Sequence, residues 1–423
     1  MNLGEIQNKH TTSSLYTIMA FILGLLSANN VFYLFVVGTT PILFICVYAL
    51  LCLGYLFLTK PSMINSAVKS IPKLLWLFLG CTLLSIFLVV LFNRAYIYQW
   101  AVGIVDLLLY SAIVLLVIAL KDNLSAIATG IAFGVIINAL FVIYAFVLFK
   151  GGTIFTLQNL FPEWNMPIQL LYNDFRGWGL FLEPGHLMRY VATVSIFVYI
   201  ATRKTNKGLS LAFLFSVVVI MIFTISSAIA VFVVGLIAFF LFVGKIDIKK
   251  TAPVFLISGI AFLVFFILSK TTTFGAEIWN YFIDGLFNIT ESDVSSNIRK
   301  TGMQNAIDVI KEYPVIGCGW NIFTKVFQDF GYYTIDVRGS YSALLSLIAE
   351  LGIGALTYIS FICSSTLHCL KSKSVSNIAL GCSIMIYFAL YSLTDYSING
   401  DCAVFIGLII ANDIRTKSQS TIK

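Results

Sequence analysis

Residues 209–243 read LSLAFLFSVVVIMIFTISSAIAVFVVGLIAFFLFV and contain no charged side chain. About 20 apolar residues are enough for a helix to cross a bilayer, so this run is too long for a single crossing. The polar pair Ser226-Ser227 interrupts it near the middle. We therefore predict two membrane helices here, at 208–224 and 226–243.

The rest of the chain has the same apolar character. Of its 423 residues, 59% are hydrophobic and 11% are charged, and the mean hydropathy is +0.96. Such a composition cannot give a protein a water-facing surface on all sides. The apolar segments suit helices, which satisfy their own backbone hydrogen bonds in lipid, and lack the alternation of membrane strands. The sequence thus predicts an all-α integral membrane protein.

Hydropathy allows about 12 transmembrane helices to be drawn. They are expected at 15–36, 40–58, 72–92, 100–120, 124–149, 187–202, 208–224, 226–243, 252–269, 342–367, 376–393 and 399–412. They divide the chain into helices 1–5 (1–149), a first outer loop (150–186), helices 6–9 (187–270), a large outer loop (271–341), and helices 10–12 with a cytoplasmic tail (342–423).

The positions of Lys and Arg predict the orientation. With the N-terminus in the cytoplasm, the inner flanks hold 16 of 26 basic residues and 4 of 19 acids, so their net charge is 16 − 4, about +12. The remainder carries 10 − 15, about −5. Because basic residues favour the cytoplasmic side, we predict that both termini lie inside. The net charge of +7 is then a topology signal, and no nucleic-acid partner is expected.

The cysteines and the start of the chain point to no further chemistry. Seven of the eight cysteines fall in or beside apolar spans, only Cys318 lies in a polar loop, and no CxxC occurs, so we predict packing residues. The first apolar stretch lacks the cleavage site of a signal peptide and is expected to be retained. Histidines are too scarce to predict a metal site, and no nucleotide-binding loop or cofactor is predicted.

Residues 183–189 place charges where a polar loop enters an apolar helix. Glu183-Pro184-Gly185-His186 has the form of a helix start, with an acidic cap and proline at the first helical position. Glu183, His186 and Arg189 would then share one face. In one interpretation Glu183 caps the helix and pairs with Arg189; in the other, the helix amides and Arg189 bind a phosphate or pyrophosphate.

A catalytic base on the predicted outer side has two candidates. His186 is one, because His10 and His368 fall on cytoplasmic flanks. Glu183 is the other. A histidine at a helix start can also serve only as a hydrogen-bonded structural residue, so both assignments stay open.

The large outer loop is predicted to fold as a small lid. Residues 296–312 form an amphipathic pattern with Ile298, Ala306, Val309 and Ile310 as its apolar stripe, and Pro314 ends that helix. Arginines accompany both loops, on a side that is acidic overall, and suggest bidentate contacts with anions. Salt bridges with nearby acids are the alternative for any one of them. They are Arg176, Arg299 and Arg338.

The order of these motifs resembles the bacterial O-antigen and capsule polymerases of the Wzy type and the related O-antigen ligases. The resemblance rests on Arg176 with Glu183-Pro184-Gly185-His186, on Arg299 with residues 313–319 (YPVIGCG), and on Ser340-Tyr341 leading to residues 350–354 (ELGIG). It covers much of residues 172–356. The many helices and the large outer loop late in the chain are similar too.

The resemblance implies a metal-independent membrane glycosyltransferase of GT-C-like architecture, without cofactor, in the bacterial plasma (inner) membrane. Its substrates would be glycans on undecaprenyl pyrophosphate, joined at the outer, periplasmic face into the O antigen of lipopolysaccharide or into capsular polysaccharide. A chain-length regulator is a further partner it allows. His186 or Glu183 would be the catalytic base, and the residues binding pyrophosphate or glycan would be Arg176, Arg189, Arg299, Arg338 and Tyr341.

This chain differs from the ligases of the group at one position of the late loop. Ligases carry a histidine near the end of the late loop, where this chain has Gly339-Ser340-Tyr341-Ser342. We therefore predict the polymerase, with a ligase that transfers glycan to lipid A core or protein as the alternative. A lipid-linked oligosaccharide flippase is a third hypothesis. It is disfavoured because buried charges are few and polar residues concentrate in the outer loops.

Overall fold

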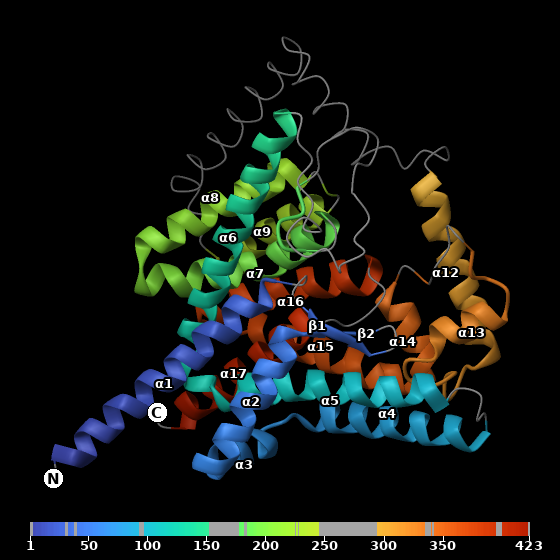
Figure 1. Ribbon diagram of the computed structural model, residues 1–423, viewed down its shortest axis with the longest axis horizontal. Helices are drawn as coiled ribbons and strands as arrows, with labels where there is room; N and C mark the ends of the chain where they lie inside the picture. The colour runs from blue at the N-terminus through green and yellow to red at the C-terminus, as the bar shows by residue number, and fades with distance from the viewer. Residues whose placement is uncertain are drawn as a thin grey trace.

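A computed structural model shows a helical bundle (Figure 1). It describes residues 3–29, 33–37, 40–92, 97–151, 177–181, 184–224, 226, 228–244, 294–334, 340, 342–394 and 400–421. The regular elements of the described part are helices, apart from one short hairpin in which β1 (Tyr33–Val37) pairs antiparallel with β2 (Thr40–Leu43). The protein is therefore an all-α integral membrane protein, as predicted.

The helices of the first half of the chain are α1 (Leu3–Ser27), α2 (Phe44–Thr59), α3 (Pro61–Lys69), α4 (Lys73–Phe92), α5 (Ile97–Ala119), the 3-10 turn η2 (Lys121–Asn123), α6 (Leu124–Lys150) and α7 (Pro184–Thr205). Those of the second half are α8 (Lys207–Thr224), α9 (Ala228–Phe242), α12 (Val294–Glu312), α13 (Phe323–Asp329), α14 (Ala343–Leu351), η4 (Gly352–Gly354), α15 (Ala355–Leu370), α16 (Val375–Thr394) and α17 (Gly400–Thr421).

Two predictions from hydropathy are confirmed in detail. The charge-free run divides as expected, since α8 ends at Thr224 and α9 begins at Ala228. The amphipathic helix of the late loop is α12, which ends at Glu312, two residues before the proline. Its predicted apolar stripe faces a small core, in which Ala306 and Val309 are fully buried.

The first connection differs from the prediction. The span expected at 15–36 is wrong beyond Ser27, where α1 ends, because residues 33–37 form a strand. That stretch is rich in aromatic and β-branched residues, which favour strands. A second helix, α3, follows α2 at an angle of 114°. Pro61 explains the bend, since it disfavours helix at the residue before it and suits the first position of a new one.

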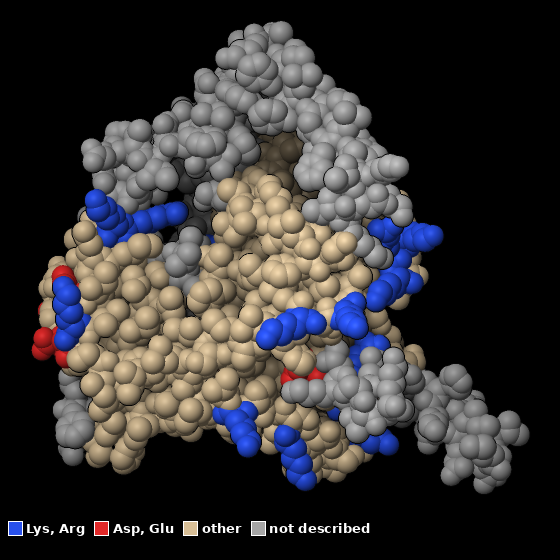
Figure 2. All heavy atoms as spheres, turned by 180° about the vertical axis from the view of Figure 1, so that it is seen from behind, with Lys and Arg blue, Asp and Glu red and all other residues tan. Residues whose placement is uncertain are grey.

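Four helical units in the described residues are long and apolar enough to cross a membrane, or five if the bent pair α2–α3 is one span. They are α5, η2 with α6, α8, and α14 with α15. Shorter apolar helices include parts of α1, α4 and α16, and α9. The total of twelve crossings stays a prediction, and the helix expected at 252–269 lies outside the described residues. Uncharged side chains cover most of the surface in Figure 2.

α7 is the central helix of the bundle. It packs against α6, α8, α9 and α16, and almost all of its first half is buried, including the charged Arg189. On the far side of α6, α1 lies backbone to backbone against it. A Cβ on Gly24 would collide with the Ile127 carbonyl, and one on Gly130 with the Phe21 carbonyl. Small residues allow such close approach between helices in lipid.

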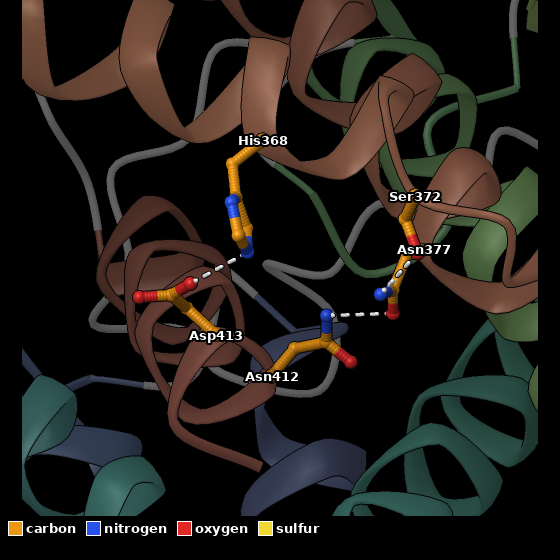
Figure 3. Close-up of polar contacts among 5 residues, drawn as sticks. All are labelled: His368, Ser372, Asn377, Asn412 and Asp413. Carbon is orange, nitrogen blue, oxygen red and sulfur yellow. Dashed lines mark hydrogen bonds and ion pairs between the residues drawn. The ribbon is translucent and has the colours of Figure 1, made fainter. Parts of the chain in front are cut away.

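Contacts between helix ends fall into two groups, as alternating crossings require. Lys204 at the end of α7 bonds Ser376 at the start of α16 (2.7 Å), and His368 of α15 lies 3.2 Å from Asp413 of α17. Figure 3 shows this second contact beside a chain of hydrogen bonds from Asn412 to Asn377 to Ser372. Lys204, His368, Ser372 and Asp413 belong to connections predicted to be cytoplasmic, and their partners lie at the adjoining ends of predicted membrane helices.

The opposite ends make the second group. Ser27, the last residue of α1, shares a 2.7 Å hydrogen bond with Tyr190 near the start of α7. Trp320, in the connection between α12 and α13, donates to the Gly103 carbonyl near the start of α5 (3.2 Å). In Figure 1, α12 and α13 lie at the end of the bundle opposite the two termini. Which group faces the cytoplasm stays a prediction.

Gly130→Ala should destabilise the protein by roughly 1–3 kcal/mol, because the new methyl group forces α1 and α6 apart. Thermal unfolding of the purified protein measures the change. Gly54→Ala in α2 is the matched control, since nothing lies within 4 Å of its Cβ position and alanine is the better helix former. Equal melting temperatures for the two variants would contradict the close packing.

Candidate functional site

The first candidate segment is the turn at 177–181 that leads into α7. Leu180 N donates to Asn138 Oδ1 of α6 (2.6 Å), and Gly177 N donates to the carbonyl of Phe223 near the end of α8 (2.8 Å). Gly179 has φ +56°, and a Cβ there would collide with Asn138. A glycine is needed at this position for both reasons. The turn is thus seated between α6 and α8.

Asn138 is fully buried in an otherwise apolar part of α6. Besides accepting from Leu180, its Nδ2 donates to the carbonyls of Ala28 and Gly134, each at 2.8 Å. One side chain therefore provides hydrogen-bond partners for backbone groups at the end of α1, in its own helix and in the turn before α7. Polar groups buried in lipid-exposed proteins need such partners.

α7 begins at Pro184, which confirms the predicted helix start. His186 is half-buried in its first turn, and Arg189 follows one turn later at 8% exposure. The next residue, Tyr190, packs its ring at a tilt against Phe181 of the preceding turn and shares a hydrogen bond with Ser27. His186 and Arg189 are thereby held at the end of the bundle where α1 ends. Glu183, the proposed cap, lies outside the described residues.

The second candidate segment, residues 313–322, docks on the end of α14. Cys318 N donates to the Ala349 carbonyl (2.7 Å), Gly319 N to the Glu350 carbonyl (3.0 Å), and Ile353 N to the Val315 carbonyl (3.0 Å). The two motifs singled out in the sequence, at 313–319 and 350–354, are thus in direct contact. No pattern in the sequence indicated this contact.

Two glycines make this docking possible. Gly317 has φ +78°, and a Cβ on it would collide with the backbone of Glu350 and Leu351. Gly352 has φ +55°, and a Cβ on it would collide with the backbone of Val315 and Gly317. Each glycine therefore fits against the other motif, and neither position accepts a side chain.

The docked loop also contacts α4 and α5. Ser85 Oγ of α4 donates to the Glu350 carbonyl (3.2 Å), and Trp320 lies over Gly103 of α5. Burial raises the pKa of the Cys318 thiol well above its ordinary value, which disfavours the nucleophilic thiolate form. This agrees with its predicted role in packing.

The Glu350 side chain is half-buried where the loop docks. It accepts hydrogen bonds from the backbone amides of Asn321 and Phe323, and Asp106 of α5 is near enough to interact with it electrostatically. The sequence analysis assigned neither acid a part in the site. Their partners come from elements about 30 and more than 200 residues away in the chain, which no local pattern reveals.

The late loop has its own small core. Ala306 and Val309 of α12 pack with Ile322, Phe323 and other residues of the following turn and α13, against Ala349 of α14. The loop is therefore a folded lid, as predicted. Arg299 and Lys300 are exposed on α12, and among the described residues neither has an ion pair. Basic and acidic side chains gather on this side of the molecule in Figure 2.

Three of the predicted site residues are described. His186 and Arg189 lie together on α7, and Arg299 lies apart from them on α12. α12 packs on α13 and α14, and α14 connects to α7 through α16, so the described residues do not bring Arg299 into contact with the α7 pair. The remaining predicted residues, Arg176, Glu183, Arg338 and Tyr341, lie outside the described residues.

The serines around Tyr341 have structural roles. Ser342 caps α14 by accepting from Leu345 N (3.3 Å), and Ser340 is fully buried with its Oγ 2.6 Å from Ser346 Oγ. At the position where ligases carry a histidine, this chain thus builds a helix cap. Within the described part of the chain, no group of three His, Cys, Asp or Glu residues could hold a metal ion.

Part of the chain matches a known protein family. Residues 209–360 match the family model described as O-antigen ligase. The matched stretch runs from α8 into α15 and so includes the lid, its docking loop and α14, but not the start of α7. No curated protein matches the chain.

Asn138→Ala should lower stability by about 1–3 kcal/mol or more, because the buried Leu180 amide and Ala28 carbonyl lose their partner. Thermal unfolding and protease cleavage at the turn before α7 provide the measurement. Thr129→Ala is the control on the same helix, since its exposed hydroxyl bonds the Ser125 carbonyl one turn away. If Asn138→Ala melts like Thr129→Ala, the side chain does not anchor the turn.

Proposed function

Because the chain belongs to the O-antigen ligase/polymerase superfamily, we propose that it is a polymerase of lipid-linked glycans. The family supports a membrane enzyme that handles glycans carried by lipids. In our proposal it joins undecaprenyl-pyrophosphate-linked repeat units into O-antigen or capsular polysaccharide. The reaction takes place on the outer face of the bacterial plasma membrane, with both termini in the cytoplasm.

The observation that carries this proposal is the docked lid within the matched stretch. A folded loop, held on the membrane helices by two motifs, presents an exposed arginine beside the bundle. The preference for a polymerase over a ligase comes from residues 339–342, where buried serines stand in place of the ligase histidine. The family description itself favours the ligase, which is therefore the second candidate.

The proposed chemistry uses a donor that is already activated. A hydroxyl group of the acceptor glycan attacks the anomeric carbon of the donor, the bond from that carbon to the lipid pyrophosphate breaks, and the pyrophosphate leaves with the electron pair. His186 or Glu183 takes the hydroxyl proton. Arg176, Arg189 and Arg299, with Arg338 and Tyr341, stabilise the charge that develops on the pyrophosphate or hold the glycan.

Burial of Arg189 suits this role. A guanidinium at 8% exposure must be paired or hydrogen-bonded, and its fixed position one turn after His186 would place both groups at the same end of α7. Arg299 is the more accessible of the two and would reach the substrate from the lid. In the proposal the substrate lies between the lid and the start of α7, and the two arginines contact it from these two elements.

Purified protein with lipid-linked repeat units decides between the candidate functions. A polymerase should extend chains without ATP or nucleotide sugar, and a chelator of divalent metals should leave the rate unchanged. A ligase should form product only after lipid A core or an acceptor protein is added. If no new glycosidic bond forms under either condition while the lipid-linked substrate changes leaflet in vesicles, the protein is a flippase.

Arg299→Ala and Arg176→Ala should each reduce chain growth by about a hundredfold or more, with normal expression in the membrane. Arg299→Lys should also be impaired, because lysine cannot make the bidentate contact. Polysaccharide length in a complemented deletion strain gives the readout. Lys311→Ala is the control, since Lys311 is exposed on the same helix and pairs with Asp308 at 2.8 Å. Wild-type chain length in both arginine variants would refute the proposed site.

A further inference from the structure

Glu350 binds the docking loop through both its backbone and its side chain. Its carbonyl accepts from Gly319 N (3.0 Å) and from Ser85 Oγ (3.2 Å), and its carboxyl group accepts from the amides of Asn321 and Phe323. The loop, α4 and α14 thus meet at Glu350.

The backbone at this point needs to be held. Asn321 has φ 59°, the left-handed conformation that a residue with a side chain rarely adopts. Such a conformation persists where the surroundings fix it. The Glu350 carboxyl group bonds the amide of that residue and the amide at the start of α13, so it fixes the direction in which the chain enters the helix.

The direction of α13 in turn determines where α12 lies. Phe323 and Val326 of α13 share a buried core with Ala306 and Val309 of α12. Both helices contact α14, which carries Glu350. A shift at Asn321 would therefore move the surface of α12 that carries Arg299.

We propose that Glu350 is a latch, a positioning residue whose carboxyl group holds the lid closed on the membrane helices and thereby sets the place of Arg299. The latch itself stands apart from the proposed function. Only its consequence for Arg299 rests on the enzyme being a glycosyltransferase that uses that arginine.

Cys318 provides a direct reporter of the latch. The thiol is 6% exposed beneath the docked loop, and burial raises its pKa, so it should react slowly with a polar maleimide in the purified full-length protein. Glu350→Ala leaves two amides without a partner and should raise the labelling rate at Cys318 by about tenfold or more. Glu350→Gln keeps one acceptor oxygen and should have a smaller effect. Mass spectrometry of the Cys318 peptide measures the rate.

Glu312→Gln is the matched control, because Glu312 is an exposed acid at the end of α12. In this variant the maleimide should label Cys318 at the wild-type rate. A folded Glu350→Ala protein that also labels at the wild-type rate would overturn the latch. If Glu350→Ala does not fold, hydrogen exchange of the wild-type protein decides. Protected amides at Asn321 and Phe323 support the latch, and exchange at both as fast as at Tyr333 overturns it.

Chain growth tests the link to Arg299 separately. If the latch positions that arginine, Glu350→Ala should reduce chain growth, and the double variant with Arg299→Ala should be no worse than Arg299→Ala alone. If the double variant instead loses chain growth by the product of the two single losses, Glu350 does not act through Arg299. The latch would then still stand on the labelling of Cys318. If the wild-type protein labels as expected but never extends a glycan, the proposed function fails and the latch stands.

Discussion

Backbone amides and carbonyls that leave a helix inside a membrane protein must find partners there, because lipid offers none. Both candidate segments meet this constraint in the same manner. The turn at 177–181 is held by Asn138, and the loop at 313–322 is held by Glu350 and by the carbonyls at the end of α14. Asn138 and Glu350 thus stand where irregular backbone meets the bundle, and the proposed chemistry lies beside these points.

The second constraint is that backbones approach each other closely at two places, and glycines make this possible. Gly24 and Gly130 bring α1 onto α6, while Gly317 and Gly352 bring the docking loop onto η4. The first pair needs only the absence of a side chain. The second pair also needs a left-handed backbone, which explains why the loop can reverse direction within a few residues.

Much of the helical layout could be predicted, because hydropathy and proline are local signals. The division between α8 and α9, the start of α7 at Pro184 and the end of α12 before Pro314 are examples. The hairpin at 33–43 was missed because its residues are as apolar as a membrane helix. The site was harder: helical spacing predicts that His186 and Arg189 share a face, but the partners of Asn138 and Glu350 depend on how distant helices pack.

The mutual fit of Gly317 and Gly352 has a consequence for building hybrid proteins from related sequences. The stretch from the docking loop to η4 should be exchanged only as a whole, because the backbone at Gly317 fits against the end of α14 and the backbone at Gly352 fits against the loop. Exchange of segments between relatives should succeed with junctions before residue 313 or after residue 354. A junction placed between them would unite halves whose backbones were never fitted to one another.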